Sequence, residues 1–186
     1  MAKQRADAFV QGARNPAMWR SSAGTNRRTA KMLYDRYIKA HKDYVVWMEA
    51  SVKPPYRRAK ISNETIGDMG IGKSALMHYG LALECSLKAH IVEGGVDPVQ
   101  NASTDNPSLK TEFLHHDLAR YVRQAFGNKA PTISSEQSRY LTDLTRAITA
   151  GKYPVEKRAK AEWAYTAELD EKVNFADAFM RYLKTT

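Results

Sequence analysis

The sequence has almost nothing that would place the chain outside a cell or inside a membrane. Its 186 residues include one cysteine, Cys85, so no internal disulfide can form. No run of about 18 apolar residues occurs, which excludes a membrane-spanning helix. The basic residues 1–16 lack the continuous apolar stretch of a secretory signal. We therefore expect a soluble cytoplasmic protein without a membrane partner, in a setting that keeps the cysteine reduced.

Two further absences limit the fold and the chemistry. No segment shows the sustained alternation of polar and apolar residues, rich in β-branched side chains, that indicates strands. Histidine and cysteine do not occur at the spacing of a zinc site, and two adjacent histidines on a helix, such as His115 and His116, point in different directions. We expect no β-sheet, no metal and no other cofactor.

What the sequence does contain is a series of helical patterns separated by glycine and proline. In four of them apolar residues recur at three- and four-residue steps, and in the fifth, 74–92, the chain is apolar nearly all round, as in a central buried helix. The predicted helices are approximately 25–50, 74–92, one within 111–126 with Leu114 pointing inward, 134–151 and 162–183. Ser134 with Gln137 has the pattern of a capping box that opens the fourth helix. The pattern predicts an all-α bundle of five helices (four to six) over 25–186, after a basic flexible arm or short helix at 1–24.

The positive charge is concentrated in the first third of the chain. The formal net charge is +9; residues 1–60 carry 14 Lys/Arg against 4 Asp/Glu, while residues 61–186 carry 15 against 16. This asymmetry indicates a polyanion partner, in the first place RNA, although a solvated surface that keeps the protein soluble remains an alternative. The basic residues expected to contact nucleic acid are Arg27, Arg28, Lys31, Lys39, Lys42, Arg57 and Arg58.

Arg36 and His41 form one candidate catalytic pair. They lie five residues apart on the first long predicted helix. In ribonuclease chemistry an arginine can steady a phosphate while a histidine moves a proton. The alternative is an arginine that faces phosphate or solvent beside a histidine that packs in the bundle.

Glu84, Lys88 and His116 are the other candidates. Glu84 and Lys88 are the only Asp, Glu, Lys or Arg residues between 75 and 92, at the i,i+4 spacing and in the order that favour an ion pair. A carboxylate on so apolar a helix is costly to bury without a partner. The pair is therefore either a polar clamp that fixes helix packing or part of a cleft wall. His116 is either a general acid/base or a hydrogen-bonded packing residue.

Three short segments together resemble the HEPN superfamily of prokaryotic helical domains. Residues 79–89 contain Ala82-Leu83-Glu84-Cys85-Ser86-Leu87-Lys88-Ala89, similar to the family stretch A-x-E-x-x-L-K-A. His116-Asp117-Leu118 resembles an H-D-L that opens the next helix, and Gly151-Lys152-Tyr153-Pro154 resembles an R-Y-P that follows the fourth. In the third segment Lys152 stands in place of the arginine.

This resemblance implies an all-α bundle, often dimeric, with a role in toxin–antitoxin, phage-defence or RNA-processing systems. It also implies a metal-independent ribonuclease with an R-x4-6-H motif on a late helix. No histidine follows His116 here, and the matching spacing of Arg36 and His41 lies on the first helix instead. The expected partners are thus RNA, a cognate antitoxin or other protein, and a second copy of the chain.

Two other functions stay open. One is a non-catalytic module that binds another protein through a face of the bundle. The other is nucleotide binding, because residues 67–74 match the P-loop pattern G-x-x-x-x-G-K-[ST], with Lys73 as its lysine. A P-loop needs a strand before it and a parallel sheet around it, and neither is predicted.

Overall fold

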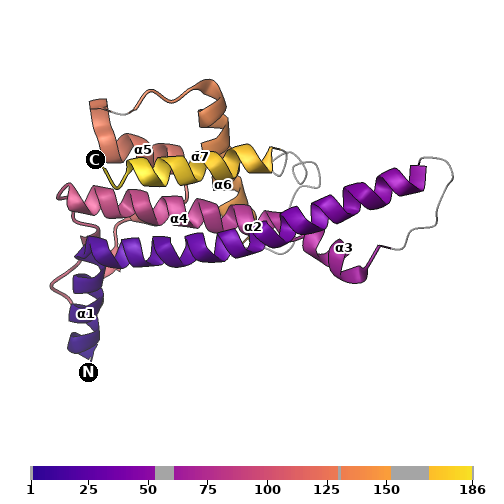
Figure 1. Cartoon of the computed structure of the whole chain (residues 1–186). Helices are drawn as coiled ribbons and strands as arrows, with labels where there is room; N and C mark the ends of the chain where they lie inside the picture. The colour runs from indigo at the N-terminus through magenta and orange to yellow at the C-terminus, as the bar shows by residue number, and fades with distance from the viewer. Residues whose placement is uncertain (1, 53–60, 130, 152–167, 186) are drawn as a thin grey trace.

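The structure, a computed structural model, describes residues 2–52, 61–129, 131–151 and 168–185. The α-helices, labelled in Figure 1, are α1 (Ala2–Arg14), α2 (Pro16–Val52), α3 (Asn63–Met69), α4 (Gly72–Glu93), α5 (Leu118–Phe126), α6 (Ser135–Gly151) and α7 (Leu169–Tyr182). Two 3₁₀ turns, Thr111–Phe113 and Gly127–Lys129, flank α5. In the described ranges the strands are β1 (Val99–Gln100) and β2 (Ser108–Leu109), which pair antiparallel. The predicted all-α helical bundle is confirmed.

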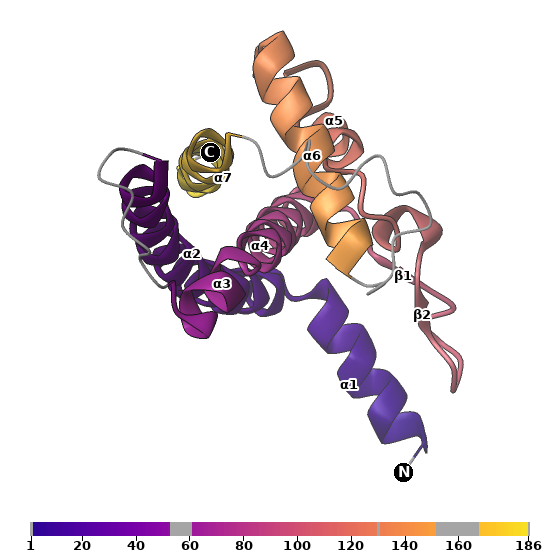
Figure 2. The ribbon, with the colours of Figure 1, turned by 90° about the vertical axis from the view of Figure 1, so that its right-hand side faces the viewer.

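Helix α4 is the centre of the molecule. It contacts α2, α5, α6 and α7, and Figure 2 shows these helices arranged around it. Its side chains are buried around most of its circumference, including Leu76, Leu83, Leu87 and Ile91, which are at most 2% exposed. The apolar run predicted to form a central helix therefore does so, because only a helix with neighbours on several sides can bury apolar groups on most of its surface.

Helix α2 is the longest element and runs along one side of α4. Its 37 residues correspond to about 55 Å at 1.5 Å per residue. It runs antiparallel to α4, whereas α7 runs in the same direction as α4 (Figure 1). Its buried side chains are the alanines Ala23, Ala30 and Ala40, whose small size allows the helices to approach closely. The C-terminal end of α2 projects past the other helices together with α3 (Figure 1).

Residues 1–24 were predicted to form a flexible arm or one short helix, followed by a long helix from about Thr25. Residues 2–14 form a helix, and α2 begins at Pro16 rather than near Thr25. Asn15 caps α2, because its side-chain oxygen accepts a hydrogen bond from the Ala17 amide at 3.0 Å. Proline in the first helical position needs no hydrogen-bond acceptor for its nitrogen. Polar and glycine-containing residues 21–26 stay helical because one face packs on α4.

The helix predicted within 111–126 is present as α5 and occupies the second half of that range. The chain makes a 3₁₀ turn, and α5 begins at Leu118 with Asp117 as its cap; the Asp117 carboxylate accepts from the Arg120 amide at 3.0 Å. Leu114 was predicted to point inward, and this is wrong: it lies before the helix and is 59% exposed. The predicted capping box that opens α6 is confirmed, with reciprocal hydrogen bonds between Ser134 and Gln137 of 3.0 and 3.1 Å.

The P-loop-like residues 67–74 connect the end of α3 to the start of α4. They follow a helix, whereas a phosphate-binding P-loop follows a strand and takes its shape from that strand. The sheet formed by β1 and β2 lies elsewhere in the chain. Nucleotide binding at Lys73 therefore has no structural basis in the described part of the molecule. No helix among the described residues is long and apolar enough to cross a membrane.

Candidate functional site

Three of the five predicted catalytic residues meet inside the bundle. The Lys88 ammonium lies 2.6 Å from one Glu84 carboxylate oxygen, and His116 Nδ1 lies 2.8 Å from the other. Both Glu84 and Lys88 project from α4 and their side chains are 5% and 7% exposed. His116 reaches them from the turn before α5. The interpretation of Glu84 and Lys88 as an ion pair on one helix is consistent with this geometry.

Aromatic rings enclose the Lys88 ammonium. It lies 5.3 Å from the centre of the Trp19 ring and 5.1 Å from that of Tyr121, distances at which a cation is attracted to the ring face. The Tyr121 hydroxyl donates to the His115 carbonyl, and burial raises the pKa of this phenol. A cation enclosed in this way has little access to a substrate. The cluster has the contacts of a clamp that joins α4, α2 and α5.

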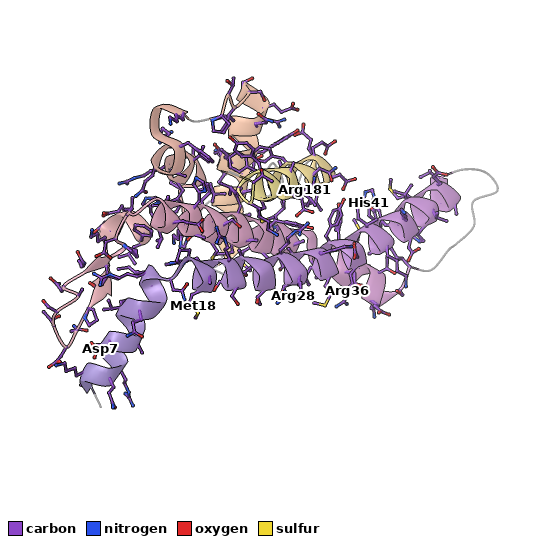
Figure 3. The ribbon with its side chains drawn as sticks, turned by 60° about the vertical axis from the view of Figure 1, so that its left-hand side comes forward. Asp7, Met18, Arg28, Arg36, His41 and Arg181 are labelled. Atoms are coloured by element: carbon purple, nitrogen blue, oxygen red, sulfur yellow. The ribbon has the colours of Figure 1, made fainter. Side chains whose placement is uncertain are left out.

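Arg36 and His41 do not converge in this chain. The Arg36 guanidinium makes two hydrogen bonds to the Asp68 carboxylate, of 2.5 and 3.3 Å, and so joins α2 to α3. The His41 ring stacks on Tyr37 with centroids 5.7 Å apart. Five residues correspond to a rotation of about 140° around a helix, so the two side chains leave α2 in different directions (Figure 3).

A cationic groove lies between α2 and α7, above α4. Its cavity volume is about 510 Å³. On α2 its lining residues recur at three- and four-residue steps from Arg20 to Lys31, and on α7 they do so from Asp177 to Arg181, so each helix contributes one face; Leu183 and Lys184, just after α7, complete the lining. We call this cavity the α2–α7 groove. Its lysines and arginines are Arg20, Arg27, Arg28, Lys31, Arg181 and Lys184.

The cations of the groove fall into two groups. Arg27 makes hydrogen bonds of 2.7 and 3.1 Å with Asp177, which raises the pKa of the guanidinium, Arg20 pairs with Glu93, and Lys31 lies 2.6 Å from Asp35. Asp177 is the one carboxylate among the lining residues.

The second group has no carboxylate partner. Arg28 donates only to the Thr25 hydroxyl, at 3.2 Å. Arg181 and Lys184 make no ion pair with any residue that the structure describes. The groove therefore has an excess of positive charge that its own residues leave uncompensated.

The floor of the groove is formed by α4 and is largely closed. Tyr79 is 2% exposed, burial raises its pKa to about 12, and Tyr34 packs edge-on against it with ring centres 6.5 Å apart. His90 packs on Phe126 at 5.0 Å. The groove thus offers charged walls above a small, mostly covered aromatic surface.

The structure divides the predicted nucleic-acid-binding residues. Arg27, Arg28 and Lys31 line the groove, whereas Lys39 is exposed outside it and Lys42 lines a second cavity of about 430 Å³. Arg57 and Arg58 lie outside the described residues.

Sequence reasoning missed the other half of the groove, formed by Arg181 and Lys184, and also Arg20. The spacing of Asp177, Met180 and Arg181 on one helix face was a signal in the sequence, but nothing there indicated that this face lies beside α2.

Comparison with family models, with curated proteins and with solved structures finds no match to the chain. The assignment of function therefore depends on the chemistry of the residues described above.

Proposed function

We propose that the chain is a HEPN-like RNA-binding protein that holds the RNA backbone in the α2–α7 groove. One observation supports this above the others: Arg28, Arg181 and Lys184 face a single cavity without a carboxylate partner in the described ranges. All three residues are exposed, so a ligand can reach them, and phosphate oxygens are partners that guanidinium and ammonium groups bind readily. Phosphate contacts dominate the affinity of proteins for nucleic acids.

The HEPN-like assignment is supported by where its motifs lie. Glu84 and Lys88 of the first segment meet His116 of the second, although 32 residues separate Glu84 from His116 in the sequence. Residues 152–154 of the third segment lie outside the described residues. A role in a defence or toxin–antitoxin system, a cytoplasmic location and a cognate protein partner belong to this proposal through the resemblance.

Cleavage of the bound RNA is the enzymatic activity that this proposal includes. If the protein cleaves RNA, we expect Arg36 and His41 to do so where two copies of the chain meet, with Glu84, Lys88 and His116 as supporting residues. The double substitution Arg36→Ala and His41→Ala should then abolish cleavage of a labelled RNA. Unchanged cleavage by that variant would exclude these residues from the reaction.

RNA binding can be tested by fluorescence anisotropy with a labelled RNA at a series of salt concentrations. Binding through phosphate contacts should weaken steeply as salt rises, with a slope of log K against log salt of about −0.7 for each contact in a single strand. RNA that does not bind at low salt, or binds with no salt dependence, would contradict the proposal.

A second candidate function is a protein-interaction module. The C-terminal part of α2 and α3, which we call the outer segment (residues 41–52 and 63–69), exposes several apolar side chains. Val46 is 68% exposed, Val52 65% and Ile66 54%. Apolar groups gathered on one projection are typical of a surface that binds another protein. Binding there should depend little on salt, in contrast to binding in the groove.

A further inference from the structure

We propose that the α2–α7 groove admits a single nucleic-acid strand, excludes a duplex, and holds the strand by its phosphates without reading its bases. This inference rests on the proposed RNA binding and specifies the form of nucleic acid that the groove accepts. Three features of the groove support it: its small volume, the position of its unpaired cations, and its closed floor.

The small volume of the groove favours a single strand over a double helix. The lining residues on α2 extend from Arg20 to Lys31, which corresponds to a length of about 16 Å. The cavity over that length has a volume of about 510 Å³. A phosphodiester chain is slender enough to enter such a cavity, whereas a duplex carries two backbones with the paired bases between them.

The unpaired cations lie on both sides of the channel. Arg28 lies on α2 and Arg181 on α7, as labelled in Figure 3, and Lys184 follows the end of α7. A strand lying between the two helices would bring its phosphates to both sides, as in proteins that bind single strands in a positively charged groove. A duplex resting on the rim could reach the outer cations only from one side.

The closed floor of the groove indicates that the protein does not recognise bases. Proteins that stack bases present exposed aromatic rings, and stacking contributes about 1–3 kcal/mol per base. Here Tyr79 is 2% exposed, and His90 is occupied by its packing on Phe126. With no open ring in the described lining, affinity should come from the backbone and be nearly the same for different base compositions.

The experiment compares three ligands and two kinds of variant by fluorescence anisotropy. The ligands are a labelled oligouridine, an oligoadenosine of equal length, and a blunt RNA duplex of that length. The charge variant is Arg28→Ala, Arg181→Ala and Lys184→Ala. Its matched control is Lys110→Ala, Arg123→Ala and Lys129→Ala, which removes three cations from the part of the chain around α5.

A steric variant tests the channel without changing its charge. Gly24 lines the groove, and a Cβ built on it would meet only the end of the Arg28 side chain, at 3.6 Å. The substitution Gly24→Leu should therefore fill the channel while α2 stays folded. Gly12→Leu, on α1 with nothing within 4 Å of its Cβ, is the control. Circular dichroism checks that both variants retain their helix content.

We expect both oligomers to bind with affinities within about threefold of each other, and the duplex at least tenfold more weakly. The charge variant should lower single-strand affinity at least tenfold and reduce the salt slope by about 2, and Gly24→Leu should lower affinity without changing the slope of any residual binding. Both controls should bind like the unmodified protein.

The other outcomes separate the two proposals. If the duplex binds as tightly as the single strands and Gly24→Leu has no effect, the single-strand inference is overturned while RNA binding stands. A tenfold preference between the two oligomers would overturn recognition by the backbone alone. If no ligand binds at low salt, the proposed function itself fails.

Discussion

Lys88 shows how much a single buried charge depends on its neighbours. Glu84 neutralises it at 2.6 Å and two aromatic rings cover it. Loss of one partner from a buried pair leaves an uncompensated charge and costs about 3–5 kcal/mol, although replacing both partners is often nearly neutral. The consequence is a strong coupling between Glu84 and Lys88.

We expect Lys88→Met to lower the free energy of unfolding by about 3 kcal/mol, because methionine fills the same volume but leaves the Glu84 carboxylate with His116 alone. Urea denaturation followed by circular dichroism measures this. The double variant Glu84→Gln and Lys88→Met should recover a large part of the loss. Equal losses in the single and double variants would show that the two residues are not coupled.

His115 makes stability depend on pH. Burial lowers its pKa, and its Nε2 is buried without a hydrogen-bond partner, while its ring stacks on Tyr121 at 4.5 Å. Burial also lowers the pKa of His78. Below pH 6.5 or so the unfolded chain therefore binds protons that the folded chain does not, and stability falls as pH falls.

We expect the urea midpoint to decrease between about pH 7.5 and pH 5, and to decrease less in His115→Phe, which keeps the aromatic stack and removes one titrating group. Asp97 provides an internal reference, because Arg14 holds its pKa at about 2 and its contribution is lost only at much lower pH. An identical pH dependence in the variant and the unmodified protein would rule out His115 as a source.

At the level of elements, helix packing here depends on small residues. Gly80 brings α4 against α6: a Cβ at this position would lie 2.8 Å from an Ile148 side-chain carbon and 3.0 Å from the Leu144 carbonyl oxygen. The backbone oxygen cannot move without shifting α6. The space between α4 and α6 at this crossing therefore requires glycine at position 80.

Gly80→Ala should destabilise the protein by about 1–2 kcal/mol, because overpacking costs more than the gain in helix propensity. Gly12→Ala makes the same change on α1, where a Cβ meets nothing within 4 Å, and should be neutral or slightly stabilising. Thermal unfolding of the two variants gives the comparison. If both variants shift the midpoint in the same direction and to the same extent, the predicted steric clash is absent.

Helices marked by a local sequence signal could be predicted, whereas helix boundaries that depend on tertiary contacts could not. The capping box at Ser134 and the apolar run of α4 are local, and both were predicted correctly. Asn15-Pro16 is an equally local start signal for α2, but the polar residues 21–26 masked it. Those residues are helical because Ala23 and Ala30 pack on α4, and such tertiary contacts override weak propensity.

At the scale of the whole molecule, pairs that link distant elements were invisible in the sequence. Lys172 on α7 is completely buried and lies 2.8 Å from Asp143 on α6, yet neither residue stands out in its own segment. The α2–α7 groove is a second example, because its two sides are about 150 residues apart, as in the pair Arg27 and Asp177. The excess of basic residues in the first third of the chain indicated the α2 side of the groove but not the α7 side.

The outer segment leads to a prediction about assembly. If two copies of the chain associate through it, Val46→Gln with Val52→Gln should shift the mass measured by sedimentation equilibrium toward the monomer. The free energy of unfolding of the monomer should change by less than about 0.5 kcal/mol, because these side chains are exposed. A monomeric unmodified protein at high micromolar concentration would exclude dimerisation through this surface.

The two helices that line the α2–α7 groove are also synthesised at different times. A ribosome produces the residues of α2 long before those of α7, so a nascent chain has Arg20 to Lys31 but neither Asp177 nor the cations beyond it. Until α7 emerges and docks, the channel has only one wall. Fragments that end before α7 would consequently lack the channel, and the proposed binding of a strand would require the complete chain through α7.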